Sequence, residues 1–157
     1  MMRPIVGFAQ DVEGHWVARL SCGHGQHTRH DPPFQERSWV LRQEGRDARI
    51  GTSLDCLRCD RREMPEGHAA YRRTAEFDAS SVPDGLLRRH TTKAGVWGLI
   101  HVVRGRLAYH VDAPFHTHAV LEPGSPGVVL PEVEHCVAPE GEVAFFVEFW
   151  RPAGTAT

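Results

Sequence analysis

Several kinds of segment are missing from this sequence of 157 residues. No apolar run approaches the roughly 20 residues of a membrane-spanning helix, and the opening MMRPIVGFAQ lacks the apolar stretch of a secretory signal. No run rich in lysine or arginine marks out a surface for nucleic-acid phosphates. We therefore expect a cytoplasmic protein that binds neither membranes nor nucleic acid.

The sequence also has almost no helical periodicity, no internal repeat and no low-complexity segment. Short β-branched and aromatic runs separated by Gly and Pro are typical of an antiparallel barrel. We predict a mainly β protein, in which a small zinc-ribbon-like β module precedes a cupin-type (jelly-roll) antiparallel β-barrel. Strands are expected at 16–20 and 38–41 in the module, and in the barrel at 97–103, 107–111, 119–121, 127–130 and 143–150, with a turn at 104–106.

The composition changes near residue 63, where polar, cysteine-containing sequence gives way to strand-like runs. The intervening RREMPEG has the charge, Pro and Gly of a linker. This division predicts a Cys/His zinc-binding module at 1–63, a linker at 64–70, a cupin-like barrel at 71–152 and a tail at 153–157.

Three of the four cysteines lie in the first module, near histidines. Zinc favours four thiolate or imidazole ligands, and a Cys-x-x-Cys turn presents two sulfurs to one ion. We predict structural zinc held by Cys22, Cys56 and Cys59, because so small a module needs a staple. The fourth ligand is His24 or His27, with a slight preference for His24, and His30 is a more distant third choice.

The alternative is a thioredoxin-like redox pair at Cys56 and Cys59. That interpretation requires a βαβ context that the sequence lacks, and it leaves Cys22 unexplained. The segment GFAQDVEGHWVARLSCGHGQHTRHDPPF, followed by Trp39-Val40 and the run CLRCD at 56–60, resembles a small uncharacterised bacterial zinc-finger-like family. The resemblance implies no activity.

In the second module, Pro131 to His135 after the turn PGSPG resembles the second cupin motif, and 100–107 resembles the hairpin that closes the first. Thr92, Ala94 and Gly98 stand where the first motif has two histidines and an acid. The residues at those spacings therefore do not predict the standard cupin metal site.

More closely, the runs LLRRH at 86–90, KAGVWG at 93–98, PEVEH at 131–135 and FVEF at 146–149 resemble the cupin-like domain of tellurite-resistance protein B and its stand-alone relatives. The resemblance implies a jelly-roll barrel, and it implies His90, His135 and Glu148 as metal ligands. Two histidines and one carboxylate suit iron or zinc with open coordination positions. If Glu148 faces the interior, it needs either this metal or a basic partner such as Lys93.

Two further features have simpler interpretations. His116, His118 and Glu122 have the H-x-H-x-x-x-E spacing of a first cupin motif, but they lie just before the second-motif turn, so we favour exposed loop histidines. Cys136 is expected to be a small buried residue and not a nucleophile, because it points away from the face of His135.

Three functions remain open at this point. The first is a metal-binding accessory protein of stress or tellurite-resistance type, whose barrel binds a metal, small molecule or oxyanion. The second is a metal-dependent cupin enzyme of dioxygenase or isomerase type. The third is a protein-interaction module. Methyl transfer is not expected, since the sequence has no Gly-rich cofactor loop, and the resemblance to cupin-like barrels suggests a homodimer.

Overall fold

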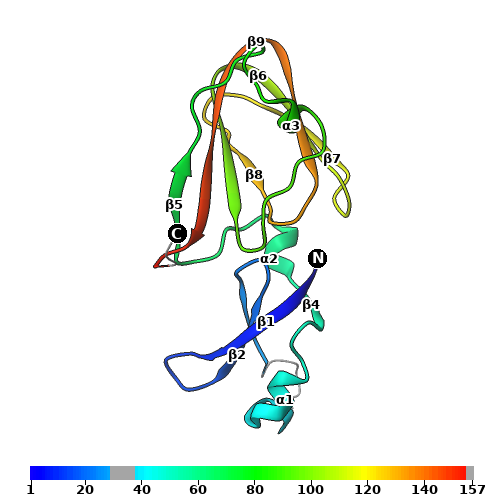
Figure 1. Cartoon of the computed structure of the whole chain (residues 1–157), viewed down its shortest axis with the longest axis vertical. Helices are drawn as coiled ribbons and strands as arrows, with labels where there is room; N and C mark the ends of the chain where they lie inside the picture. Colours follow the sequence, from blue (N-terminus) through cyan, green and yellow to red (C-terminus); the bar gives the residue numbers. More distant parts are fainter. Residues whose placement is uncertain (29–37, 155–157) are drawn as a thin grey trace. The chain divides into compact units, whose positions relative to one another are not determined.

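The computed structural model describes residues 1–28 and 38–154. The chain divides into two compact units, Met1–Glu66 and Gly67–Thr157 (Figure 1). Among the described residues, β-strands far outnumber the few short helices, which confirms the predicted mainly β fold class. The helices among them have four or five residues each, and none is long and apolar enough to cross a membrane.

The first unit is a small antiparallel sheet with the strand order β3-β2-β1-β4. Its short helices are η1, α1 and α2. The strand bounds are β1 (Met2–Gln10), β2 (Trp16–Leu20), β3 (Gly25–His27) and β4 (Ser53–Asp55), and the helix bounds are η1 (Ser38–Leu41), α1 (Gln43–Asp47) and α2 (Leu57–Asp60). Few large apolar side chains are buried in this unit, and three cysteines are buried with them.

The strand predicted at 38–41 is wrong, because this segment forms the 3₁₀ helix η1. Aromatic and β-branched residues favour a strand, but tertiary packing decides here. The Trp39 ring lies 6.0 Å from the ring of Phe8 in edge-to-face contact. A Cβ atom on Gly45 of α1 would lie 2.1 Å from the Trp39 carbonyl oxygen, so α1 packs directly against η1. This close approach requires a turn of chain and not an extended strand.

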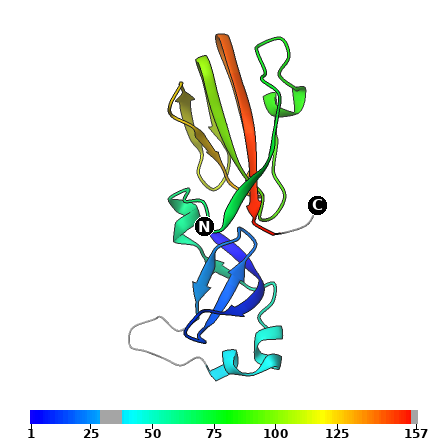
Figure 2. The same cartoon turned by 90° about the vertical axis from the view of Figure 1, so that its left-hand side faces the viewer.

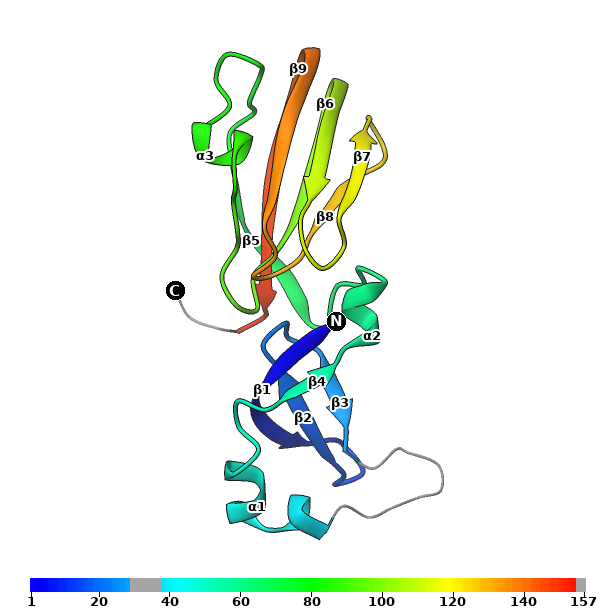
Figure 3. The ribbon, with the colours of Figure 1, turned by 90° about the vertical axis from the view of Figure 1, so that its right-hand side faces the viewer.

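The second unit contains one curled antiparallel sheet built around β6 and β9. These two strands pair along almost the whole length of β6 and run side by side in Figure 3. Strand β5 pairs with β9, while β8 and β7 pair with the first and second halves of β6. The bounds are β5 (His68–Arg73), β6 (Trp97–Val111), β7 (Thr117–Leu121), β8 (Gly127–Val129), β9 (His135–Pro152) and the short helix α3 (Asp84–Leu87).

The turn predicted at 104–106 is wrong, since β6 continues through this segment as one strand. The register with β9 shifts twice between Val102 and Arg106, which is the signature of bulges. Gly105 has a left-handed φ of 76° in this segment. A glycine of this kind is also common in turns, but here pairing with β9 continues on both sides of it. The bulges bend the sheet, so that the two halves of β6 belong to two facing layers.

The layers enclose an apolar interior. Tyr109, in the second half of β6, donates a hydrogen bond of 2.9 Å from its hydroxyl to the Val128 carbonyl of β8, which pairs with the first half. Ile100, Val129 and Phe145 are 0 to 2% exposed in this interior. Side chains at alternate positions of β6 and β9 therefore fill the space between the layers, as a cupin-type curled sheet requires.

Substitution of Gly105 tests the role of the bulge. A Cβ atom at this position would lie 2.0 Å from the Glu142 carbonyl oxygen, in addition to the left-handed φ. We expect Gly105→Ala to lower the free energy of unfolding by more than the roughly 1–2 kcal/mol of a left-handed alanine. Urea denaturation followed by hydrogen exchange of β6 and β9 amides measures this.

Gly141→Ala is the matched control. Gly141 has the same φ of 76°, but a Cβ atom added to it would meet no atom within 4 Å beyond its chain neighbours. Equal losses of stability in the two variants would show that the contact with Glu142 is unimportant.

Candidate metal centre

The buried Cys/His group is assembled by two local turns. Cys22 and His24 lie in the connection between β2 and β3, where Gly23 has a φ of 92° and donates a 2.9 Å backbone hydrogen bond to the Leu20 carbonyl. Cys56 is the N-cap residue of α2, and Cys59 lies within that helix. The Cys59 amide donates a 3.0 Å hydrogen bond to the Cys56 carbonyl, so one turn brings both residues to the same site.

The donor atoms of Cys22, His24, Cys56 and Cys59 all lie within 4.8 Å of one another. Nδ1 of His24 is 3.4 Å from Sγ of both Cys22 and Cys56, and 3.8 Å from Sγ of Cys59. The Cys22 and Cys56 sulfurs are 3.9 Å apart. A tetrahedron with Zn–S and Zn–N bonds of about 2.3 and 2.05 Å has S–S edges of about 3.8 Å and S–N edges of about 3.6 Å. The four donors could therefore hold one tetrahedral metal ion.

Burial and electrostatics favour ligation at this group. Cys22 and Cys59 are 0% exposed, and His24 and Cys56 are nearly as buried. Burial lowers the pKa of His24, but hydrogen bonds and negative charge from Cys22 and Cys56 outweigh it and raise the pKa to about 9. Hydrogen bonds from Cys22 and Cys59 lower the pKa of the Cys56 thiol. A bound cation would replace the protons that these donors otherwise share.

His27 lies outside this group. It ends β3 with 47% of its side chain exposed, and its Nδ1 is 3.6 Å from Oδ2 of Asp11. Of the two residues expected to compete for the fourth position, the structure brings only His24 to the cysteines. The third choice, His30, lies outside the described residues.

The variants His24→Gln and His27→Gln separate these two histidines. We expect His24→Gln to weaken the tightly bound metal by at least about a hundredfold, because it removes one of four ligands from a buried site. His27→Gln should retain that metal. Competition with a chromophoric chelator gives both affinities. A tight site that survives His24→Gln but is lost in His27→Gln would contradict this assignment.

In the second unit, the backbones of His90 and His135 pair through two hydrogen bonds of 2.9 Å. Their rings lie 5.4 Å apart at nearly right angles beside a cavity of about 10 Å³, which is room for a single water-sized occupant. Burial lowers the pKa of His135, and the neighbouring His90 lowers it further. Nδ1 of His135 is 3.0 Å from the Val133 carbonyl oxygen, so Nε2 of its neutral ring is the nitrogen able to bind an ion.

Glu148 does not join these two histidines, so the expected two-histidine, one-carboxylate set does not form. Strand alternation places Phe145 and Val147 of β9 in the interior and Glu148 on the opposite face. There its Oε2 lies 3.0 Å from Nε2 of His101. In the described residues, no three-donor His, Cys, Asp or Glu group includes either His90 or His135.

Sequence analysis suggested Lys93 as a basic partner of Glu148 and missed His101, which is the partner in the structure. Its ring stacks on Phe146 with 4.9 Å between centroids. The signal was present in β6, because Ile100 and Val102 are apolar neighbours that alternate with His101. That alternation places His101 on the outer face, beside the partner strand residue Phe146.

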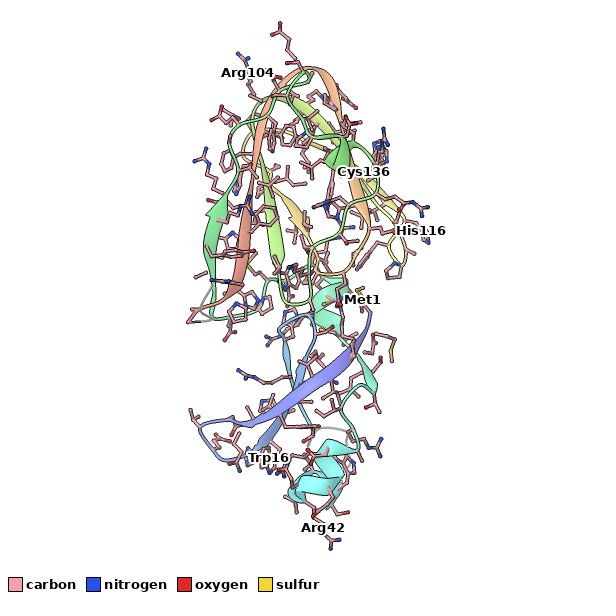
Figure 4. The ribbon with its side chains drawn as sticks, viewed as in Figure 1. Met1, Trp16, Arg42, Arg104, His116 and Cys136 are labelled. Carbon is pink, nitrogen blue, oxygen red and sulfur yellow. The ribbon has the colours of Figure 1, made fainter. Side chains whose placement is uncertain are left out.

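His116, His118 and Glu122 do not converge. His118 stacks on His110 with 4.2 Å between ring centroids, and Glu122 lies 3.3 Å from the Arg106 guanidinium. His116 has a φ of 46° in the turn before β7 and is labelled, with Cys136, in Figure 4. These histidines are exposed or partly exposed on the surface, as sequence analysis favoured.

Cys136 is partly exposed and not buried as expected. It occupies the face of β9 opposite to His135, next to His110 of β6. Burial raises the pKa of its thiol, and nearby Asp112 raises it further. The Cys136 sulfur is therefore not activated as a nucleophile.

Comparison with known proteins divides the chain in the same two parts. Residues 6–63 match the model of a family described as a protein of unknown function, DUF3565. Residues 72–147 match the model of the TehB-like domain. The second unit is similar to a TehB-like domain. Both resemblances inferred from the sequence are thereby confirmed.

Solved structures show the same fold. TehB from Haemophilus influenzae matches with a TM-score of 0.51 and 20% identity, covering 55% of this chain but only 32% of the TehB chain. A protein from E. coli strain K12 matches with a TM-score of 0.51 and 24% identity, covering 56% of this chain and 94% of its own. A search of curated proteins finds no match. The likeness to TehB thus concerns the fold of about a third of that protein.

Proposed function

We propose that this chain is a zinc-containing accessory protein of the tellurite-resistance or stress type. Cys22, His24, Cys56 and Cys59 hold a structural zinc ion in the first unit. The TehB-like second unit binds a small ligand or single ion beside His90 and His135.

The observation that carries the zinc assignment is the near-tetrahedral arrangement of three sulfurs and one imidazole nitrogen. This donor set is typical of zinc, and its soft thiolates disfavour magnesium, calcium and manganese. All four positions of the tetrahedron are occupied by protein donors. No position remains for a water molecule, so the ion is structural and not catalytic.

The size of the first unit supports a structural role. Ile5, Ala18, Leu20 and Val40 are its buried apolar side chains besides the cysteines, within the described residues. So few groups supply little hydrophobic stabilisation for a unit of this length. Metal ligation joins the β2–β3 connection to α2, which are more than 30 residues apart in the sequence. Folding of the unit is therefore coupled to the metal.

Chelation tests the zinc proposal. We expect purified protein to contain one tightly bound zinc per chain, and its removal to unfold residues 1–66 while β5 to β9 persist. Hydrogen exchange measured by mass spectrometry, with elemental analysis of the same samples, reports both events. Strands β5 to β9 should persist because the second unit has its own large apolar interior.

Cys22→Ser, which removes one ligand, should reproduce the chelated state, whereas Cys136→Ser should leave zinc content unchanged. The zinc proposal fails if metal content is near zero in protein that is fully folded, or if chelation alters neither unit.

The ligand proposed for the second unit is small because the cavity beside His90 and His135 is small. About 10 Å³ admits one ion or water molecule but no organic substrate. The apolar side chains around it, among them Ile100 and Phe145, leave the imidazoles as the main polar groups. This lining favours a single-ion or binding role over the metal-dependent dioxygenase or isomerase considered from the sequence.

Growth on tellurite tests the resistance role. We expect a host strain that lacks this chain to be more sensitive to tellurite, and the wild-type chain to restore growth. His90→Ala combined with His135→Ala should restore it poorly, because the pair lines the proposed binding cavity, whereas the exposed His116→Ala should restore it fully. The measurement is the minimal inhibitory concentration, with the amount of folded protein checked for each variant.

Equal tellurite tolerance with and without the chain would end the resistance proposal. It would leave the structural zinc assignment intact.

A further inference from the structure

A second group of His, Asp and Glu side chains comes from the turn between β1 and β2. Within the first unit, this turn is at the opposite end of β2 from the connection to β3 that carries Cys22 and His24, and the ribbon of the turn can be followed in Figure 2. Donor atoms of Asp11, Glu13 and His15 lie within 4.8 Å of one another. Nδ1 of His15 is 3.3 Å from Oε2 of Glu13 and 3.6 Å from Oδ2 of Asp11. His27, from β3, places its Nδ1 3.6 Å from the same Oδ2 atom. Two carboxylates and one imidazole thus meet at this turn, and a second imidazole lies beside Asp11.

The Asp11 carboxylate is held in a fixed orientation by the turn itself. Its Oδ1 accepts hydrogen bonds from the amides of Glu13 and His15, at 2.9 and 2.8 Å. The Asp11 amide donates a 2.9 Å hydrogen bond to the His15 carbonyl, which closes the turn. Oδ2 is consequently directed toward the two imidazoles, and these amides lower the pKa of the Asp11 carboxyl.

One of the two histidines lies on a strand, and the other lies in the turn directly before one. His27 is opposite Val17 in the β2–β3 pairing. His15 precedes Trp16, labelled in Figure 4, whose ring lies 3.8 Å beneath the Arg46 guanidinium. The imidazoles therefore approach Asp11 from the turn and from the neighbouring strand, so the group is not merely a run of adjacent acidic residues.

The spacing suits a shared cation better than direct hydrogen bonds. A separation of 3.6 Å between Oδ2 and either Nδ1 is too long for a hydrogen bond. Two donors bound to one ion at about 2.1 Å lie about 3.0 to 3.4 Å apart, depending on the coordination geometry. Movements of a few tenths of an ångström would bring the donors of Asp11, Glu13 and His15 onto an ion, whereas His27, which is near Asp11 but outside this three-donor group, would have to move farther. Mixed imidazole and carboxylate ligands suit zinc, nickel and copper.

We propose that Asp11, Glu13, His15 and His27 form a second, exchangeable site for a divalent transition-metal ion. The Glu13 and His27 side chains are 72% and 47% exposed, so an ion here exchanges with solvent, unlike one enclosed by the buried cysteines. Protein donors leave coordination positions for water or an external ligand. The site does not depend on the proposed zinc at Cys22 and its partners.

Nickel uptake by the untagged full chain tests this site, because nickel is distinguished from resident zinc by elemental analysis. We expect equilibrium dialysis against Ni²⁺ at neutral pH to load nickel with zinc content unchanged, and a variant with both His90→Ala and His135→Ala to keep the nickel bound at Asp11. Asp11→Asn is the sharpest variant, since the Asn side-chain oxygen can still accept the two turn hydrogen bonds while the second carboxylate oxygen is lost. It should weaken nickel binding by at least about tenfold.

His15→Gln and His27→Gln should weaken binding to a similar extent, and His116→Gln, an exposed histidine in the second unit, should bind nickel as the wild type does. The proposal is overturned if the wild type takes up no nickel, if Asp11→Asn and His15→Gln bind it normally, or if His116→Gln alone loses it. Circular dichroism and zinc content of each variant show that the first unit is folded. Wild-type protein without zinc would contradict the structural zinc proposal, but the nickel measurement would still test the second site.

Discussion

In the first unit, three sulfurs and one imidazole nitrogen are held close enough together to bind one metal ion. Cys22 and His24 come from a turn between two strands, and Cys56 and Cys59 come from a four-residue helix that begins more than 30 residues later. Neither segment is stable alone, because a short hairpin and a single helical turn bury little apolar surface. A cation bound by all four donors would add the cross-link that the small interior lacks. Strand β4 pairs with β1 and leads directly into α2, and so places Cys56 and Cys59 at this site.

The second unit is stabilised instead by its own apolar interior. Its two long strands, β6 and β9, bend together at the bulges near Gly105, so one sheet supplies both walls of its own interior. Large side chains from alternate positions fill this space and leave room for little more than one water molecule beside His90 and His135. The interior of this unit is therefore nearly filled by its own side chains.

Four histidines of the described residues have three different kinds of surroundings. His24 is buried among sulfurs, His135 is buried among apolar side chains with a lowered pKa, and His15 and His27 lie near the carboxylate of Asp11 at the surface. Thiolates give the first a closed, zinc-like environment. Carboxylates give the third an exposed environment suited to exchangeable cations. One residue type thus offers different metal chemistry in each place because its neighbours differ.

The sequence by itself determined the mainly β class, both family resemblances and the three cysteines as a group, since these depend on local patterns: short alternating runs and the spacing of Cys56 and Cys59. It left His24 and His27 as alternatives, because both follow Cys22 within five residues. Only the folded hairpin decides which of the two rings faces the sulfurs. The resemblance implied Glu148 as a ligand with His90 and His135, but which face of β9 is the interior depends on the bend in the sheet, and Glu148 lies on the other face. Tertiary structure also decided that Gly105 lies in a bulge and not in a turn. A glycine with left-handed φ occurs in both, and only the pairing with β9 distinguishes them.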